Sequence, residues 1–436
     1  MTTVYGSISV CAMQFWNACT ARQDADDQFA EERYIMGMIL QTAGADGGTA
    51  STVNRLESSV IALWEREGAA GVSARAVALH ADVPTSSIYH HFGGMDQLVL
   101  SASQAACAQA REWTMCQLEA LASLPGDPAA FAPLLATLID EWCEGQRPLA
   151  LAWREAQLQA MRDPARRAAA DDWTGLWRDF WTPLCIQFGF GELTGAVIAL
   201  FDGESSLHLL RWRRPIDRAM LDETCRLWTE WSNGRSSAPA PWRTMARDAA
   251  LAGQPPEPAW DETTQHIAAA AAGIVAQDGV AGLTHRAVAR AAEVTLGVVS
   301  NRFRSSAELL RAAFENTYLR TVAPLAGEQP AVSLAGNTAL PDEAALRASF
   351  ELMLVVARDP AFAPFAAQLR YLRGRTSGRY LRALVHPDRA LSAADAALFS
   401  SVMAGRSRAT MCGQSDDEAV FERMLMPLQS PGSAVV

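Results

Sequence analysis

The sequence lacks the patterns that identify several large classes of protein. No run of 18 apolar residues occurs in its 436 residues, so we expect no membrane-spanning helix. The mildly apolar stretch 4–16 has no basic flank and no convincing cleavage site, so we expect no signal peptide. The motifs G-x-S-x-G and H-E-x-x-H, the P-loop and the dinucleotide fingerprint are absent, and the acidic residues form no metal-like cluster. An enzyme is therefore the least favoured class, and we expect no cofactor and no metal.

Paired cysteines and an excess of positive charge are also missing. The eight cysteines include no C-x-x-C pair and no zinc-finger spacing, which indicates free thiols in a reducing cytoplasm, with redox sensing as the alternative. The net charge of -11 argues against a surface coated with basic residues. It does not exclude DNA binding, which needs positive charge only on the contacting face. With half of its residues hydrophobic, the chain can bury several cores.

A stretch of about thirty residues occurs twice, at 68–98 and at 279–309. The two copies align without a gap and are identical at 11 of 31 positions. Several of these matches are alanines in an alanine-rich chain, but five other pairs also fall in register. They are Gly68/Gly279, Arg75/Arg286, Val83/Val294, Phe92/Phe303 and Leu98/Leu309. A repeat of this length predicts two units of similar structure.

Each copy predicts two short helices joined by a tight turn. Gly68 and Gly279 would each end a preceding helix, because glycine readily adopts the left-handed conformation. Ser73 and Thr284 would cap the next helix. After the turn a third helix begins, with Thr295 as its expected cap in the second copy. Two short helices joined in this way are typical of a helix-turn-helix.

The first copy and the helix before it resemble the DNA-binding domain of the TetR (tetracycline repressor) family. The family's signature appears as Y-H-H-F at residues 89–92, after the glycine turn and the helix-turn-helix. In the second copy Ser300 replaces the tyrosine and Arg302 replaces the histidine. The family usually has a phosphate-binding lysine three residues after the phenylalanine, where this chain has Met95 and Ser306. The resemblance implies an all-α protein with DNA-binding heads and helical ligand-binding bodies.

We expect two tandem units, each with a three-helix head and a helical body. The predicted divisions are a disordered extension, or a translation start assigned too far upstream, at 1–51, the first head at 52–98, the first body at 99–232, a linker rich in Pro, Gly and Ser at 233–260, the second head at 261–309 and a shorter second body at 310–436. Late helices are predicted at 192–214, 217–232, 342–358, 362–382, 393–412 and 416–425. Because TetR-type proteins dimerise through their last two helices, the resemblance implies that 192–232 packs against 393–427 as an intramolecular pseudo-dimer.

Contacts with DNA are expected from the second and third helices of each copy. In the first copy the candidates are Arg75, Thr85, Ser86, Ser87, Tyr89 and His90. In the second copy they are Arg286, Thr295, Asn301, Arg302 and Arg304. An asparagine amide can pair with adenine, and arginine can bind guanine or phosphate. The alternative is a solvated helix face, which weighs more in the second copy. Because neither segment is net basic, we expect moderate affinity and a modest salt dependence.

An aromatic stripe marks the first body. Trp173, Trp177, Phe180 and Trp181 fall on one face of a single helix. Such a stripe either belongs to the core or lines a ligand cavity. The candidates for binding an apolar or aromatic effector are Trp153, Trp173, Trp177, Trp181, Phe201 and His208, although a lone histidine is more often structural. All 13 tryptophans lie at or before Trp260, which suggests that only the first body binds an effector.

These features predict a cytoplasmic transcriptional regulator that binds a double-stranded DNA operator and is released by a small molecule. The third helices differ, TSSIYHH against LGVVSNR, so the operator should be asymmetric. The chain would act as a monomeric pseudo-dimer or as a dimer of such chains. The alternative is a ligand- or protein-binding scaffold whose heads no longer bind DNA, favoured by the missing lysines and by heads that are not net basic.

Overall fold

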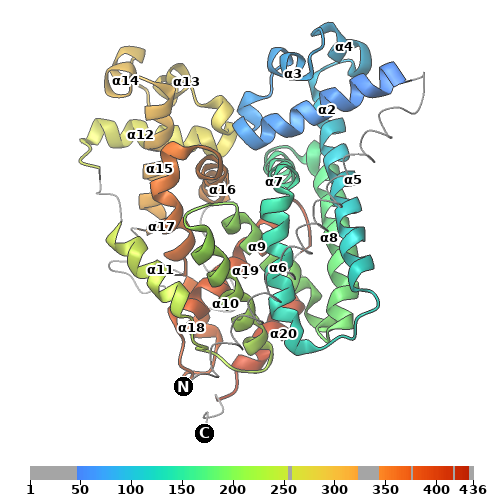
Figure 1. Ribbon diagram of the computed structural model, residues 1–436. Helices are drawn as coiled ribbons and strands as arrows, with labels where there is room; N and C mark the ends of the chain where they lie inside the picture. The colour runs from blue at the N-terminus through green and yellow to red at the C-terminus, as the bar shows by residue number, and fades with distance from the viewer. Residues whose placement is uncertain (1–46, 254–257, 323–342, 375–376, 416–417, 432–436) are drawn as a thin grey trace, which may run out of the picture. The chain divides into compact units, whose positions relative to one another are not determined.

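The computed structural model describes residues 47–253, 258–322, 343–374, 377–415 and 418–431. These residues form helices joined by turns and include no strand, as expected for an all-α protein (Figure 1). The chain divides into two units, Met1–Arg55 and Leu56–Val436, and the arrangement described below is that of the second unit. Most of the predicted N-terminal extension lies outside the described residues. Its last residues belong to helix α2 (Gly47–Glu67), which begins earlier than predicted.

The first head is formed by α2, the short turn η1 (Ala69–Gly71), α3 (Ala74–Ala81) and α4 (Ser86–Phe92). The side chain of Ser73 accepts a hydrogen bond from the amide of Ala76 at 3.2 Å, which confirms Ser73 as the cap of α3. Between α3 and α4, Asp82 adopts a left-handed conformation with φ 52°. Aspartate tolerates this region better than most residues because its short side chain can bond to the local backbone.

The second head is formed by α12 (Glu262–Asp278), η4 (Val280–Gly282), α13 (His285–Ala291) and α14 (Leu296–Arg302). Thr284 caps α13 by accepting a hydrogen bond from the amide of Ala287 at 3.1 Å. Glu293 takes φ 52° in the turn between α13 and α14. Ser73, Asp82 and their partners in the second head occupy aligned positions of the repeat, so the two copies build the same turn.

Each head is followed by a helical body. The first body contains α5 (Met95–Leu121), α6 (Pro128–Gly145), α7 (Arg147–Arg162), η2 (Pro164–Arg166), α8 (Arg167–Gln187), η3 (Gly191–Leu193), α9 (Thr194–His208) and α10 (Arg214–Ser232). The described residues of the second body form α15 (Ser306–Val322), α16 (Glu343–Arg358), η6 (Pro360–Phe365), α17 (Ala366–Tyr371), α18 (Ser377–Leu384), α19 (Ala393–Met411), α20 (Glu418–Leu425) and η7 (Met426–Leu428). Residues 323–342 lie outside the described residues.

The segment predicted to be a linker, 233–260, contains a helix that packs. Helix α11 (Pro241–Ala252) begins at a proline, which suits the first turn of a helix because its missing N–H has no partner there. Arg243, Ala246 and Ala250 of this helix are buried. The amides of Trp242 and Arg243 donate to the carboxylate of Glu223 on α10 at 2.8 and 2.9 Å. The segment predicted as a linker therefore includes a helix that packs against α10.

Two predicted late helices also end differently. The helix expected at 362–382 is broken into η6, α17 and α18, with Gly374 at φ 88°. The helix expected at 192–214 ends at His208, and α10 already begins at Arg214. Proline in the first turn of α10 favours this start, since it fixes a helical φ where no N–H is needed.

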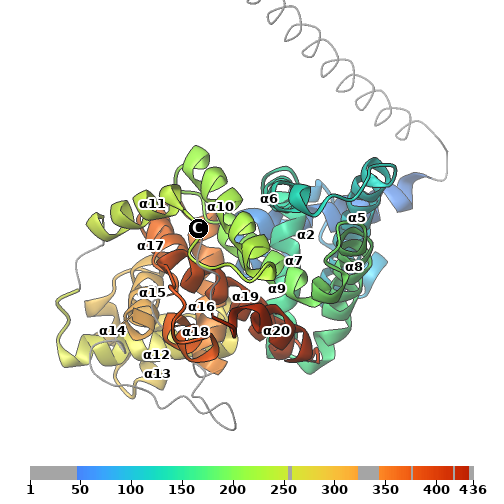
Figure 2. The same ribbon diagram turned by 90° about the horizontal axis from the view of Figure 1, so that it is seen from below.

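Helices α9 and α19 pack side by side where the two bodies meet (Figure 2). A Cβ atom added to Gly203 on α9 would collide with the backbone carbonyl of Ser401. One added to Gly405 on α19 would collide with the carbonyl of Ala199. Only glycine allows backbones to approach this closely. Ser401 also donates a hydrogen bond to the carboxylate of Glu204 at 2.5 Å.

Among the described residues no single helix is long and apolar enough to cross a membrane. Two consecutive segments would together be long and apolar enough, Glu343–Arg358 and Pro360–Tyr371. They are bent by 116° relative to each other at the break between them.

Candidate functional site

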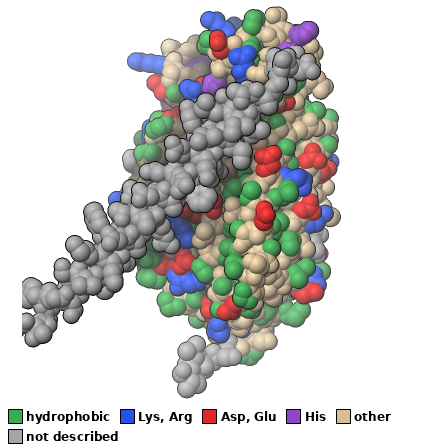
Figure 3. Space-filling model, turned by 45° about the vertical axis from the view of Figure 1, so that its right-hand side comes forward, with side chains coloured by type: hydrophobic (Ala, Val, Ile, Leu, Met, Phe, Trp, Pro, Cys, Tyr) green, Lys and Arg blue, Asp and Glu red, His purple; other side chains and the backbone are tan. Residues whose placement is uncertain are grey.

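The exposed face of the first head carries most of its predicted DNA contacts. Ile88 of α4 is fully buried and holds this short helix against the head, while Ser87 is half-buried. Tyr89 is 57% exposed, unusually much for an aromatic side chain. The exposed candidates are Arg75, Thr85, Ser86, Tyr89 and His90. On the face shown in Figure 3, histidine side chains lie at the end of the molecule that carries this head, and acidic side chains are scattered over the body.

The second head exposes its predicted contacts too, but the side chains of Thr295 and Arg302 are engaged within the head. The exposed candidates are Arg286, Thr295, Asn301, Arg302 and Arg304. The hydroxyl of Thr295 accepts a hydrogen bond from the amide of Val298 at 3.4 Å, which confirms its predicted role as the cap of α14. Arg302 donates to the hydroxyl of Thr264 at 3.0 Å and lies 2.6 Å from the carboxylate of Asp261.

Asp261 stays charged near neutral pH and holds Arg302 at the surface. Hydrogen bonds from the side chain and amide of Thr264, and then from Arg302, lower the pKa of Asp261 to about 2. The Arg302 guanidinium, predicted to meet phosphate or guanine, must leave this partner to reach DNA. In the first head, by contrast, the candidate arginine is Arg75. It is exposed and forms no ion pair with an acidic residue within the described part of the chain.

The aromatic stripe of α8 faces other aromatic side chains and fills the centre of the first body. The ring of Trp177 lies 4.5 Å from that of Phe201 on α9, 4.9 Å from that of Trp153 on α7 and 4.8 Å from that of Trp142 on α6. Trp173, Trp177, Trp181 and Phe201 are at most 1% exposed. In this conformation the predicted effector residues form a packed core, and the ligand cavity expected among them stays a prediction.

Polar atoms within this core lack partners. The indole N–H groups of six tryptophans are buried and have no hydrogen-bond partner among the described residues. They belong to Trp113, Trp142, Trp173, Trp177, Trp181 and Trp228. A buried donor without an acceptor typically costs about 1–3 kcal/mol. Most buried donors in folded proteins are satisfied, so this group of unpaired N–H donors marks the region where an acceptor would stabilise the body most.

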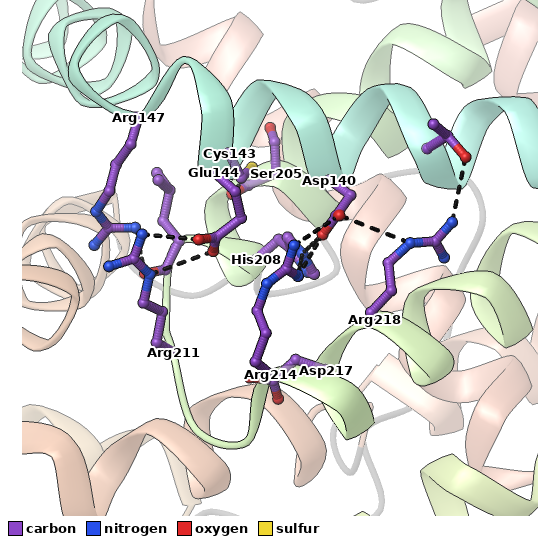
Figure 4. Close-up of polar contacts among 12 residues, drawn as sticks. Asp140, Cys143, Glu144, Arg147, Ser205, His208, Arg211, Arg214, Asp217 and Arg218 are labelled. Atoms are coloured by element: carbon purple, nitrogen blue, oxygen red, sulfur yellow. Dashed lines mark hydrogen bonds and ion pairs between the residues drawn. The ribbon is translucent and has the colours of Figure 1, made fainter. Parts of the chain in front are cut away.

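His208 lies beside Asp140 and Arg214 (Figure 4), and through Arg370 it connects the two bodies. Its Nδ1 accepts a hydrogen bond from Arg370 on α17 at 3.1 Å. Because arginine is only a donor, Nδ1 carries no proton, and Nε2 donates to Asp140 on α6 at 2.6 Å. Arg214 donates to both oxygens of Asp140 at 2.5 and 2.7 Å. Both ring nitrogens of His208 are thus engaged, which favours the structural alternative.

Burial and partners set the charge states in this network. Burial lowers the pKa of His208, the hydrogen bond to Asp140 raises it, and Arg370 lowers it, with a net decrease. For Asp140 burial raises the pKa, but hydrogen bonds from His208 and Arg214 outweigh it and hold the pKa well below its usual range. At neutral pH the network therefore contains a neutral histidine, an ionised aspartate and two arginines.

A second polar group is buried where α9 meets α19. Asp202 lies 3.1 Å from Arg154 of α7 and also pairs with Arg408 of α19. Both arginines line a cavity of about 20 Å³ that includes side chains from α7, α9, α16 and α19, and this volume suits a single water molecule. None of the predicted effector residues lines this cavity.

Sequence reasoning missed the buried charges altogether. Arg154 and Glu155 lie in the apolar helix α7, and Arg370 lies in α17, each at most 3% exposed. The chain contains no lysine, so every cation is an arginine, which keeps its charge when buried and can bind a carboxylate through two N–H groups. Charged residues in an otherwise apolar helix were the available signal. Among the described residues no group of three or more His, Cys, Asp and Glu side chains is placed to hold a metal ion.

Two family models match segments of the chain between residues 61 and 230. Residues 61–102 match the model described as bacterial regulatory proteins, tetR family. Residues 126–230 match the model of the tetracyclin repressor-like C-terminal domain. Among curated proteins, none matches the chain. The two matched domains follow one another as α2–α5 and α6–α10, so residues 61–230 carry the domain pair of a TetR-family, DNA-binding transcriptional regulator.

Proposed function

We propose that this regulator is a repressor that binds an asymmetric operator with the two heads of one chain, performs no enzymatic turnover, and is released by an apolar, aromatic effector in the first body. The observation that carries the two-headed arrangement is the reciprocal contact between α9 and α19. Gly203 meets Ser401, and Gly405 meets Ala199. The two glycines are 202 residues apart, and so are the two residues that they meet.

Reciprocity of this kind is the property of a twofold interface. In a symmetric homodimer, residue i of one subunit contacts residue j of the other, and j contacts i in return. Here the relation holds between two segments of one chain. Both segments follow a helix-turn-helix that has a side-chain cap and a left-handed turn residue at aligned positions of the repeat. A single chain therefore carries what a TetR-type homodimer assembles from two.

The operator follows from the difference between the two recognition helices. Helix α4 presents Tyr89 and His90, whereas α14 presents Asn301 at the corresponding part of the repeat. Because the two heads offer different hydrogen-bonding groups to base edges, they prefer different half-sites. The operator of one chain is then two unlike half-sites about one helical turn apart, roughly 34–36 Å.

Release by an effector requires that the effector favours a body geometry with wrongly spaced heads. The packed tryptophans of the first body support a site for a planar aromatic compound. Contacts between the compound and the tryptophan rings would replace contacts that the rings now make with one another. Acceptor atoms on the same compound would satisfy the unpaired indole N–H groups. Polar acceptors on an apolar frame are therefore the expected chemistry of the effector.

The test of DNA binding begins with sequences selected by the chain from a random DNA pool. We expect tight binding that weakens as salt rises, and a loss of about tenfold or more when Tyr89 and His90 are both changed to alanine. The matched control is Ile186→Ala, a change at a residue of α8 that is 65% exposed and outside the heads. Selection of no sequence, or equal binding by the double variant, would refute the function.

A second candidate function, a scaffold that binds a ligand or a protein without DNA, is favoured by the ion pair between Arg302 and Asp261. That pair removes an exposed cation from the face that would meet phosphate. The scaffold predicts that aromatic compounds change the tryptophan fluorescence of the first body while no DNA is bound. The repressor predicts that the same compounds also release the selected DNA.

A further inference from the structure

Ion pairs join the two bodies directly beneath the heads, where α7 of the first body and α16 of the second lie side by side (Figure 1). Glu155 and Arg162 are seven residues apart on α7, and Glu351 and Arg358 are seven apart on α16, so each pair lies on one face of its helix. Glu155 pairs with Arg358 at 2.7 Å, and Glu351 pairs with Arg162 at 2.5 Å. We call these four residues the neck.

Each glutamate of the neck also receives the head of its own half. The amide of Ala69, in the turn after α2, donates to Glu155 at 3.3 Å. The amide of Val280, at the equivalent turn after α12, donates to Glu351 at 3.0 Å. One carboxylate thus accepts hydrogen bonds from a head of its own half and from an arginine of the other half.

Each arginine of the neck touches the head of the opposite half. A Cβ atom on Gly68 would lie 2.8 Å from a guanidinium nitrogen of Arg358. A Cβ atom on Gly279 would lie 2.9 Å from the guanidinium of Arg162. Both glycines have positive φ, 70° and 73°, so the turn requires glycine for its backbone as well as for this approach. The two glycines aligned in the repeat are therefore the points where the heads rest on the neck.

Burial makes this arrangement stiff. The side chains of Glu155 and Arg358 are 4% and 9% exposed, and those of Glu351 and Arg162 are 11% and 19% exposed. Ion pairs screened from water are weakened little by salt, and a carboxylate that loses its arginine there is left uncompensated. Rotation of one head relative to the other would have to break both pairs.

We propose that the neck residues Glu155, Arg162, Glu351 and Arg358 fix the distance between the two heads and thereby determine the half-site spacing that this regulator accepts. They are positioning residues that touch no DNA. This role rests on the proposed function, in which both heads bind one operator. It adds a determinant of specificity outside the recognition helices.

The test compares the full native chain with Arg162→Ala and with Glu351→Gln on operators whose half-sites are separated by spacers of varied length. The native chain should accept one spacer length. Either variant should bind spacers one or two base pairs longer or shorter within about threefold of the best, with unchanged preferences inside each half-site. The matched control is Arg423→Ala, which removes the exposed ion pair with Glu192 far along the chain from the neck. Arg162→Lys keeps the charge and serves if a variant fails to fold.

A measurement of the distance between the heads in the absence of DNA distinguishes failure of the neck's spacing role from failure of the proposed function. Labels attached to non-natural amino acids at the aligned, exposed positions Leu79 and Arg290 report the separation of the heads. The distribution should be narrow in the native chain and broad in the neck variants. A narrow distribution in the variants, or a broad one with an unchanged single spacer, would overturn the role of the neck. Selection of no DNA by the native chain would instead refute the proposed function and the spacing role with it.

Discussion

The two heads are built alike and equipped differently. Asp82 and Glu293 take the same left-handed conformation at aligned positions, and Ser73 and Thr284 make the same cap. On the exposed faces the likeness ends, because α4 carries a tyrosine and histidines whereas α14 carries an asparagine and an arginine. Positions that shape the turn are thus shared, and so is the candidate pair Arg75 and Arg286, whereas the candidates on α4 and α14 differ. This is the pattern expected when both heads keep one geometry and read two sequences.

The two bodies differ more than the heads. The first body packs tryptophan rings from α6, α7 and α8, whereas the aromatic cluster beside α15 consists of Phe314, Phe362, Phe365 and Tyr318. What the bodies share is the surface where they meet, with its reciprocal glycines and crossed ion pairs. The surface where the bodies meet is therefore the part of the bodies in which the two halves are alike.

The largest expected effect comes from breaking that shared interface. Gly203→Val and Gly405→Val each place a side chain against a backbone carbonyl of the other half. We expect each to lower the free energy of unfolding by about 3 kcal/mol or more, and by similar amounts. Thermal unfolding followed by circular dichroism checks this.

The control for the glycine variants is Gly175→Ala on α8, where an added Cβ meets nothing within 4 Å. Alanine at an open helical position should leave the protein as stable or stabilise it by up to about 1 kcal/mol. Tolerance of valine at either Gly203 or Gly405 would contradict the reciprocal contact.

The next effect compares the heads as readers of DNA. Tyr89→Ala should change base preference in one half-site only, and Asn301→Ala in the other, each with a loss of about 1–3 kcal/mol in binding free energy. Selection from random DNA with each variant measures both preferences. If the two variants altered the same half-site, or neither did, the two-reader account would fail.

A smaller effect is expected from the His208 network that joins the bodies. The pKa of His208 is lowered in the folded chain. As pH falls below the ordinary histidine value near 6.5, the unfolded chain therefore binds more protons than the folded chain. The stabilisation is fully present above that pH and is lost as pH falls through the folded pKa. We expect the unfolding midpoint to fall as pH is lowered below about 6.5.

His208→Gln provides the comparison for this pH dependence. Glutamine can still donate to Asp140 and accept from Arg370, but it does not titrate. The pH dependence of the unfolding midpoint below about pH 6.5 should therefore shrink in this variant. An unchanged slope would show that other groups cause it.

The smallest effect sharpens the contrast between the heads. Asp261→Asn removes the charge that holds Arg302 and keeps a residue able to cap α12. Release of one arginine toward phosphate should steepen the salt dependence of DNA binding by about one counterion. A titration of affinity against salt measures this slope, and a flatter slope than that of the native chain would contradict the prediction.

Local structure was predictable where it depends on interactions between a residue and its near neighbours in the sequence. Caps at Ser73, Thr284 and Thr295 followed from side chains that bond to nearby amides. The α-helical fold followed from helical spacing of apolar residues. The break at Gly374 and the packing of α11 were missed, because both depend on neighbours distant in the sequence. Arg243, for example, is buried where its amide donates to Glu223 and its guanidinium donates to Thr224, both on α10.

The candidate sites were predictable in part for the same reason. Exposed positions on short recognition helices follow from the repeat, and Tyr89 is indeed exposed. The engagement of Arg302 by Asp261 joins residues about forty positions apart, and the pairing of Glu155 with Arg358 joins residues about two hundred apart. No local pattern encodes such partners, since the charge of a side chain does not tell which opposite charge the fold brings to it.

The most direct test of the central claim is a hydroxyl-radical footprint of the chain on its selected operator, read together with the mass of the complex. We expect one chain per operator and two protected patches of unlike sequence, one helical turn or roughly 34–36 Å apart. A single protected patch, or two chains on a perfect palindrome, would contradict it.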